Sequence, residues 1–312
     1  MAGLITTLTL NPALDLASKA DTVRPLHKIR TYNDRIDPGG GGINVARVVH
    51  ALGGETLALV VAGGVTGHYI EDLLDHSGVP RRTIPIEGRT RISLTVFEQT
   101  SGLEYRFVPE GPKLSEPEWQ AVLAVVDTIE DGWLVLSGSL PPGAPTDAYT
   151  QLARMAAGRG VRVALDSSGP ALAAAMCGCG IAVVKPSLRE LEALSGHPLD
   201  DPSDQDDCAM SLARSRAAAM VAVTLGPAGA LLATADGVLR MHSLKEPVRT
   251  AVGAGDSFVG ALVLQLARGR AAREALTWAI AAGATAVAGT GTADVDLERV
   301  SRRVRLLQSQ FD

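Results

Sequence analysis

An aspartate that follows a glycine-rich turn is the clearest chemical signal in this chain. Residues 250–258 read TAVGAGDSF and lead into a predicted helix. Glycines before a helix leave backbone N–H groups free to approach an anion, and the helix dipole adds positive charge there. Such a turn can stabilise a phosphoryl group in transfer, and Asp256 is the candidate base for the attacking hydroxyl. Taken alone, Asp256 is equally well explained as a residue that favours a helix N-terminus.

A second glycine-rich segment lies near the N-terminus, where residues 38–47 read PGGGGINVAR. Four consecutive glycines run into an amphipathic helix, so backbone amides there can also approach an oxygen-rich ligand. A flexible loop with Asn44 near a helix start is the simpler alternative. No Gly-Lys-Ser/Thr sequence follows, so the phosphate loop of the P-loop ATPases is excluded.

Two further segments follow buried strands, at the strand ends where open α/β sheets bind ligands. Residues 185–190 read KPSLRE, and residues 224–230 read TLGPAGA. In the first segment, Ser187 and Glu190 have the spacing of a helix capping box, which explains them without any ligand. The second segment contains a Gly-Pro-x-Gly pattern that by itself predicts only a turn.

An α/β core is predicted to position these segments. Apolar runs, rather than alternating patterns, indicate strands buried on both faces, as in a parallel sheet covered by helices. The predicted strands are residues 4–10, 56–62, 133–136, 161–165, 181–184 and 220–225. The predicted helices are residues 43–52, 70–76, 116–129, 145–157, 188–194, 257–268, 272–287 and 296–308.

Two stretches, residues 20–37 and 81–109, break this pattern. Within the second, residues 89–96 and 103–108 are predicted as strands separated by a Thr-Ser-Gly turn. We expect both stretches to build a small separate sheet that projects over the site as a lid. The chain is therefore predicted as one domain, residues 1–312, with lid strands within about 15–37 and 81–110.

Composition narrows the possible classes of function. A chain of 312 residues with 46% hydrophobic residues suits a compact core, which excludes disorder as the main state. A formal net charge of −5, without long runs of like charge, argues against nucleic acid as a partner. Three cysteines are too few for a disulfide framework and lack zinc-site spacing, which indicates reduced thiols. Neither a signal peptide nor a membrane span is predicted, so we expect a cytoplasmic protein without a membrane partner.

Four more segments complete the set of motifs. They read TLTLNPALD at residues 7–15, GGVTG at 63–67, SGSLPPG at 137–143 and DSSG at 166–169. With these, the sequence resembles the ribokinase-like, phosphofructokinase B (PfkB) family of carbohydrate kinases over nearly its whole length. The VGAGDS motif and the early glycine motif together are specific for the family. Within it, the chain most resembles the minor-isozyme type of 6-phosphofructokinase.

The resemblance implies a ribokinase-like three-layer α/β/α core and transfer of the γ-phosphoryl group of ATP to a sugar phosphate, with Mg²⁺ required. Asp256 would be the base, and the amides of Gly253, Ala254 and Gly255 would form the anion hole. The positions that match sugar-phosphate contacts are Asp15, Lys28, Gly40, Gly41, Asn44, Arg91 and Ser139. Lys28 is expected on a lid strand. For Arg91 and Lys28, the alternative to phosphate binding is that both lie on a solvated face of the lid. A turn position is the alternative for Asp15.

The resemblance also implies a nucleotide site and two metal sites. The matching nucleotide positions are Lys185, Ser187, Thr224, Gly226 and Gly229. Glu190 would hold Mg²⁺ through water, but Ser187 replaces the Asn that the family usually has. Because a serine reaches less far and has no amide donor, we expect weakened handling of Mg²⁺ or nucleotide. A monovalent cation, K⁺, would bind backbone oxygens of Thr250, Val252, Ala286, Gly289 and Gly291.

Fructose 6-phosphate is the first choice of acceptor, followed by tagatose 6-phosphate and fructose 1-phosphate. The four-glycine loop and Lys28 favour 6-phosphates, because relatives that act on 1-phosphates usually carry a lysine inside that loop. A lid made of strands has open edges and an apolar face, which relatives bury by pairing two lids. A homodimer is therefore expected.

Two other classes of function are alternatives to a kinase. A dinucleotide-dependent dehydrogenase is disfavoured, because no Gly-x-Gly-x-x-Gly follows residues 4–10. A sensor of sugar phosphate or nucleotide could have kept the fold and lost turnover. Asp256 argues against the sensor, whereas Ser187 leaves it open.

Overall fold

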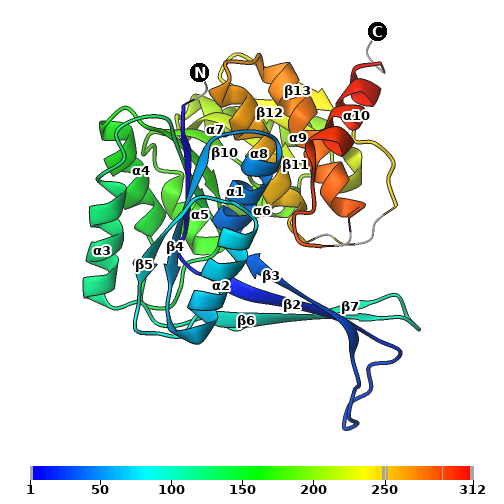
Figure 1. Cartoon of the computed structure of the whole chain (residues 1–312). Helices are drawn as coiled ribbons and strands as arrows, with labels where there is room; N and C mark the ends of the chain where they lie inside the picture. The colour runs from blue at the N-terminus through cyan, green and yellow to red at the C-terminus, as the bar shows by residue number, and fades with distance from the viewer. Residues whose placement is uncertain (1–2, 248–249, 251, 290, 310–312) are drawn as a thin grey trace.

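A large sheet of nine strands forms the centre of the computed structural model, which describes residues 3–247, 250, 252–289 and 291–309 (Figure 1). In spatial order its strands are β13 (Val238–Met241), β12 (Ala230–Ala233), β11 (Ala218–Thr224), β10 (Ile181–Val184), β9 (Arg162–Asp166), β8 (Trp133–Ser137), β1 (Ile5–Thr9), β4 (Thr56–Ala62) and β5 (Arg81–Pro85). Neighbours from β11 to β5 pair in parallel, whereas β12 and β13 add an antiparallel edge.

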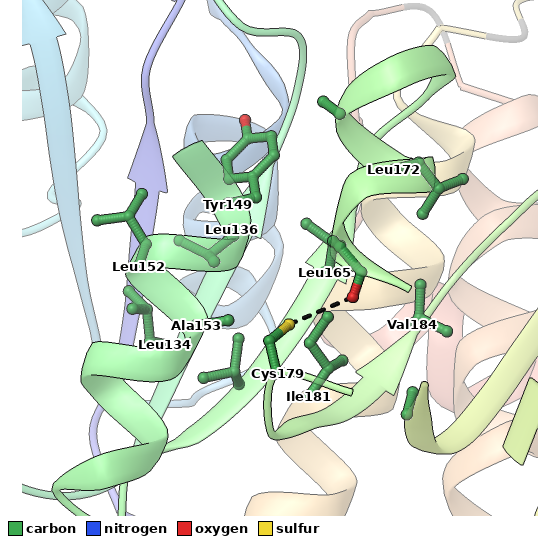
Figure 2. Packing of buried hydrophobic residues seen from close by; sticks show 14 of the residues in the cluster. Leu134, Leu136, Tyr149, Leu152, Ala153, Leu165, Leu172, Cys179, Ile181 and Val184 are labelled. Carbon is green, nitrogen blue, oxygen red and sulfur yellow. Dashed lines mark hydrogen bonds between the residues drawn. The ribbon is translucent and has the colours of Figure 1, made fainter. Parts of the chain in front are cut away.

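Helices cover both faces of this sheet, because successive strand residues point to opposite sides. In β8, Leu134 and Leu136 pack into one core, partly shown in Figure 2, and Trp133 and Val135 pack into the other. The first face is covered by α3 (Glu116–Val126), α4 (Ala148–Gly158), α5 (Gly169–Ala175), α6 (Leu188–Ser195) and α7 (Pro202–Arg214). The second is covered by α1 (Gly41–Ala51), α8 (Ala254–Ala267), α9 (Ala272–Val287) and α10 (Leu297–Gln308), while α2 (Gly64–His76) packs near β4. The predicted three-layer α/β fold is thus confirmed.

A small sheet of four strands projects from one edge of this core (Figure 1). Its order is β3 (Tyr32–Gly39), β2 (Ala13–Ala20), β6 (Arg91–Glu98) and β7 (Glu104–Phe107). The predicted strands at 89–96 and 103–108 correspond to β6 and β7. The stretch 81–109, within which the lid strands were expected, begins with residues 81–85, and these form β5 of the large sheet, paired in parallel with β4.

Several elements of the core were not anticipated from the sequence. They are α5, α7 and the hairpin of β12 and β13. The residues of α7 read PSDQDDCAMSLAR, and only Gln205, Ala209 and Ala213 are buried, so its apolar stripe is thin. The strands β12 and β13 have four residues each, which is too short for a clear pattern. In the part of the chain that is described, no helix has the length and hydropathy to cross a bilayer.

Candidate active site

Two helix N-termini meet at the centre of the site. Asn44 lies in the first turn of α1 and Asp256 in the first turn of α8. The Asn44 side-chain amide donates a 2.8 Å hydrogen bond to Oδ2 of Asp256. The helices approach closely because α8 carries Gly260 against Val48 of α1, where a Cβ would crowd the valine side chain. The structure therefore brings together the two glycine-rich motifs that are 212 residues apart.

Asp256 has the acid–base properties of a proton acceptor near neutral pH. Burial, followed by the charge of Asp166, raises its pKa to about 7, against the lowering effects of Asn44 and Lys185. At neutral pH, a substantial fraction of carboxylates with such a pKa is ionised and can accept a proton. The same pKa lets the group keep that proton once it is accepted. Gly253, the N-cap of α8, has a left-handed backbone with φ 78°, so the turn presents the following amides at the helix start.

A buried ion pair stands beside this helix start. The Lys185 ammonium lies 3.0 Å from Oδ1 of Asp166, and a Cβ at Gly255 would lie 3.7 Å from the Lys185 nitrogen. Burial lowers the pKa of Lys185, but Asp166, Glu190 and Asp256 together raise it above its ordinary value. The lysine thus remains charged next to the anion-binding turn. Asp166, at the end of β9, was not among the predicted site residues, because a strand-terminal Asp also suits a turn.

A cavity of about 680 Å³ opens on the other side of the turn. Among its lining residues are the predicted Thr224, Gly226, Gly229, Ala254 and Gly255. Residues that sequence reasoning missed complete the walls: Pro227, Ser243, Leu244, Lys245, Glu246, Phe258, Ile280, Gly283, Ala284 and Val287. Most of these are apolar. Those on α9 and in residues 243–246 lie outside every motif, so only the tertiary packing brings them to the cavity. A cavity of this size, apolar and open to an anion-binding turn, suits a nucleotide.

Ser187 adopts the capping role that was the alternative to ligand binding. Its hydroxyl accepts a hydrogen bond from the Glu190 amide at 3.3 Å, and the Glu190 carboxylate accepts one from the Ser187 amide at 2.7 Å. Both residues therefore hold the start of α6. They still lie at the end of β10, close to Lys185, and Glu190 acts electrostatically on both Lys185 and Asp166.

The predicted acceptor residues gather beneath the small sheet. Arg91 donates hydrogen bonds to the carbonyl oxygens of Pro109 at 2.7 Å and Asn11 at 2.8 Å, and it lies 3.4 Å from the Ser139 hydroxyl. Asp15, on β2, has a pKa raised to about 6, mainly by burial, while Arg106 and Arg91 act in the opposite direction. Arg91, Ser139 and Asp15 thus share one region.

The glycine loop contributes backbone only. A Cβ at Gly39 would overlap the Asp15 carboxylate, and a Cβ at Gly41 would overlap the Ser137 hydroxyl. Gly40 has φ 114°, which side-chain-bearing residues rarely adopt. The loop therefore approaches both the small sheet and the end of β8 as closely as a backbone can.

Two arginines on the site-facing side of the small sheet were missed. The strand register pairs Arg35 with Ala17, Ala17 with Thr95, and Thr95 with Arg106. This row is two residues along from Asp37 and Asp15 on the same strands, so these side chains share one face. The Arg35 guanidinium pairs with Asp37 and lies against Gly291, where a Cβ would overlap it. The small sheet therefore touches the core near the start of α8.

Lys28 lies apart from the other predicted site residues. It was expected on a lid strand, but the structure places it in the exposed loop between β2 and β3, residues 21–31 (Figure 1). Within the described residues, Lys28 has no hydrogen bond or ion pair with Asp15, Arg91 or Ser139. The sequence did not show that a loop of residues 21–31 separates the two lid strands and contains Lys28.

The residues predicted for a monovalent cation lie around the end of α9. The Thr250 amide donates a 3.3 Å hydrogen bond to the Val287 carbonyl, which places 250 and 252 beside this helix end. Gly289 follows α9, and its amide donates to the Ala286 carbonyl at 3.0 Å. A Cβ at Gly253 would crowd the Ala293 amide, so this loop touches the anion-binding turn. Ala251 and Thr290 are outside the described residues.

Comparisons with known proteins show the family and the fold of this chain. The family model of pfkB family carbohydrate kinases matches residues 9–299. The "ATP-dependent 6-phosphofructokinase isozyme 2" of Escherichia coli is 41% identical over 92% of this chain and 94% of its own length. The enzyme of the same name from Mycobacterium tuberculosis is 41% identical over 96% of this chain and 88% of its own. The crystal structure of E. coli phosphofructokinase-2 in complex with fructose-6-phosphate superposes with a TM-score of 0.92, covering 97% of this chain and 99% of that chain at 38% identity.

Proposed function

Because the chain belongs to the pfkB family of carbohydrate kinases, we propose that it transfers the γ-phosphoryl group of ATP to fructose 6-phosphate, giving fructose 1,6-bisphosphate. One observation carries the proposal. Asp256 is held by Asn44 at a helix N-terminus, with an apolar cavity on one side and an arginine-lined region on the other. A phosphoryl donor and a sugar phosphate would meet at this carboxylate.

The reaction requires placement and charge stabilisation more than covalent chemistry from the protein. ATP is proposed to occupy the cavity with its base between Phe258 and Ile280, so that its phosphates reach the start of α8. The amides of Gly253, Ala254 and Gly255 then stabilise the transferring group, and Lys185 neutralises phosphate charge. Asp256 takes the proton of the attacking sugar hydroxyl as the new P–O bond forms.

The carboxylates near Lys185 fit a magnesium ion that comes with the nucleotide. Mg²⁺ keeps several waters and is usually bound by phosphates plus one or two carboxylates. Glu190 and Asp166 both act on Lys185, so they border one small region, and one Glu190 oxygen is already used in the capping box. We expect these two residues to hold Mg²⁺ through water. When bound, the ion would neutralise the negative charge that builds up on the phosphates.

The acceptor side favours a sugar that carries its phosphate away from the glycine loop. Gly39 and Gly41 leave no room for a side chain, so basic residues can come only from the small sheet and its surroundings. Arg91 and Arg106 both act on Asp15. We propose that Asp15 and Gly40 hold sugar hydroxyls while the arginines bind the 6-phosphate. A 1-phosphofructokinase of Xanthomonas campestris, 34% identical over 83% of this chain, keeps fructose 1-phosphate as the alternative acceptor.

Specificity constants test the proposal directly. ADP release would be measured with ATP, Mg²⁺ and fructose 6-phosphate, tagatose 6-phosphate or fructose 1-phosphate, with Asp256→Asn as the inactive control. We expect the highest kcat/KM for fructose 6-phosphate. A higher value for fructose 1-phosphate would overturn the acceptor assignment. Binding of both ligands without ADP release would identify a sensor.

The far face of the small sheet supports a homodimer. Ile36, Leu16, Leu94 and Phe107 are paired in register across all four strands, on the face opposite Asp15. Ile36 is 37% exposed and Phe107 57% exposed. We propose that two small sheets pair through this face and also act as lids that exclude water from the poised phosphate. One E. coli relative has been crystallised as a "tetrameric inhibited form". Light scattering should give twice the chain mass for the parent and a smaller mass for Phe107→Asp.

The carbonyl oxygens around the end of α9 fit a potassium ion. Backbone carbonyls after a helix end are suitable ligands for a hard cation, and this loop touches the anion-binding turn at Gly253. An E. coli relative was crystallised "in complex with Potassium". We propose that K⁺ binds here and supports the shape of the turn. Turnover should then be faster in KCl than in NaCl at equal ionic strength, and equal rates would contradict the proposal.

A further inference from the structure

A tight turn between α5 and β10 carries two cysteines that the kinase site does not use. Residues 176–180 read MCGCG, so Cys177 and Cys179 are separated by one glycine. Gly178 and Gly180 have φ values of 76° and 85°, which lets the chain reverse sharply at this point. Cys177 is exposed, whereas Cys179 is 3% exposed and belongs to the core shown in Figure 2.

The two thiols have different surroundings. An Arg154 guanidinium N–H donates a 3.4 Å hydrogen bond to the Cys177 sulfur, so a positive charge lies next to this exposed thiol. The Cys179 thiol instead donates to the Ala175 carbonyl at 3.2 Å, the bond drawn as a dashed line in Figure 2. Burial and the charge of Cys177 raise the pKa of the Cys179 thiol. Cys177 is therefore the accessible nucleophile, and Cys179 is a protonated thiol next to it.

We propose that Cys177 and Cys179 form a reversible disulfide when the chain meets a hydroperoxide, which makes this turn an oxidation site. An exposed cysteine beside a second cysteine is the usual arrangement of a redox-sensitive pair. In the first step the Cys177 sulfur attacks a peroxide oxygen and the O–O bond breaks. The proton of Cys177 goes to the leaving hydroxide, which departs as water. The product is a sulfenic acid on Cys177.

In the second step the Cys179 sulfur attacks the Cys177 sulfur. The S–O bond breaks, the proton of Cys179 goes to the leaving hydroxide, and water departs. Overall, two thiols and one peroxide give one disulfide and two waters. A dithiol reductant reverses the reaction by thiol–disulfide exchange, since a strained and exposed disulfide is readily reduced.

The disulfide changes the packing at the start of β10. Bond formation removes the hydrogen bond from Cys179 to Ala175 and pulls a buried sulfur toward the surface. A disulfide between positions 177 and 179 closes a very small ring, so it lowers the entropy of the unfolded chain very little. It therefore offsets little of the stability lost from the folded chain. We therefore expect the oxidised chain to melt at a lower temperature. Lys185 is six residues further along an extended strand, about 20 Å away, so nucleotide affinity should change little.

Counting thiols after peroxide treatment tests the proposal without depending on the kinase assignment. The reduced chain has three free thiols, Cys177, Cys179 and Cys208. We expect one remaining thiol after treatment with hydrogen peroxide, and three again after dithiothreitol. Peptide mapping should show the bond between 177 and 179 within one chain. Three remaining thiols, loss of Cys208 alone, or a bond between two chains would each overturn the proposal.

Three variants test the assigned roles. Cys179→Ser should stop at the Cys177 sulfenic acid, which a 1,3-dicarbonyl reagent labels, whereas Cys208→Ser should still lose two thiols. Arg154→Gln should slow oxidation several-fold. The matched control is Arg159→Gln, which removes an arginine near the end of the same helix that pairs with Asp127 instead. Equal oxidation rates for Arg154→Gln and Arg159→Gln would contradict the role of Arg154.

Discussion

The cavity beside α8 and the region beneath the small sheet are lined by different kinds of side chain. Together they form the two halves of the proposed site. Phe258 and Ile280 give the cavity apolar walls that belong to the second core, and Val287 adds to the lining. The region beneath the small sheet is bordered instead by charged side chains, including Arg91 and Asp15. A base and ribose are recognised largely by shape, while a sugar phosphate is recognised by charge and hydrogen bonds.

The two halves also differ in how firmly they are held. The helices of the nucleotide half pack on the large sheet along their whole length, whereas the small sheet projects from its edge (Figure 1). If the cavity holds the nucleotide as proposed, that half of the site is part of the large core, whereas the acceptor half depends on the position of the small sheet. Substitutions in the two halves should affect kcat and the sugar KM differently.

Asp256→Asn should have the largest effect. The amide has nearly the same shape but cannot accept the proton, so kcat should fall roughly 10³-fold. The KM for ATP should change little, because the cavity and the α8 amides remain. The control is Asp236→Asn, an exposed position in the turn between β12 and β13. Turnover equal to that of the parent would remove Asp256 from the mechanism.

Arg91→Ala should have the next largest effect, and it should be confined to the acceptor half. Loss of a charged hydrogen-bond donor to the sugar phosphate should raise the KM for fructose 6-phosphate roughly 10- to 100-fold. The KM for ATP should stay close to the parent value. Arg82→Ala, on the exposed edge strand β5, is the matched control. Equal losses for ATP and sugar would show that the two halves are not separate.

Asn44 and Asp256 lie where the two halves of the site meet. Asn44→Ala should shift the pH dependence of kcat. Asp256 must be ionised to act, and its pKa is about 7, so kcat should rise with pH through this value. The Asn44 hydrogen bond lowers that pKa. Its loss should therefore move the acidic limb of the profile to higher pH. Profiles of parent and variant at constant ionic strength provide the test, and an unchanged or lower midpoint would contradict it.

Ser187→Asn should have the smallest effect. Asparagine caps a helix as well as serine does, so α6 should remain folded, while the longer amide reaches further toward the metal. The Mg²⁺ concentration for half-maximal rate should fall a few-fold. Ser115→Asn is a matched control, because Ser115 also caps a helix in a capping box. Identical Mg²⁺ curves for the parent and both variants would show that Ser187 has no part in metal handling.

The sequence predicted the large sheet well wherever both faces of a strand are apolar. The residues of β8, WLVLS, supply both cores, so the run is continuous and easily recognised. By contrast, β5 begins with Arg81 and Arg82 at the sheet edge, where charge is tolerated. These charged residues interrupt the apolar pattern, so no strand was predicted at 81–85.

Site residues could be predicted from the sequence where they lie in a recognisable local motif. Asp256 and Asn44 stand in glycine-rich motifs at helix starts, and the structure brings them within 2.8 Å. Phe258 and Val287 wall the cavity only because α8 and α9 pack side by side, which no local pattern reports. Lys28 was expected on a lid strand but lies in the loop between β2 and β3, and its role as a phosphate contact stays a prediction.

The small sheet reaches the core through the Arg35 guanidinium, which packs against Gly291. A Cβ at position 291 would overlap the guanidinium carbon, so the end of this flexible side chain would have to move aside. Arg35 also pairs with Asp37, which lies opposite Asp15 in the strand register. A side chain at position 291 would therefore disturb an ion pair on the face of the small sheet that carries Asp15.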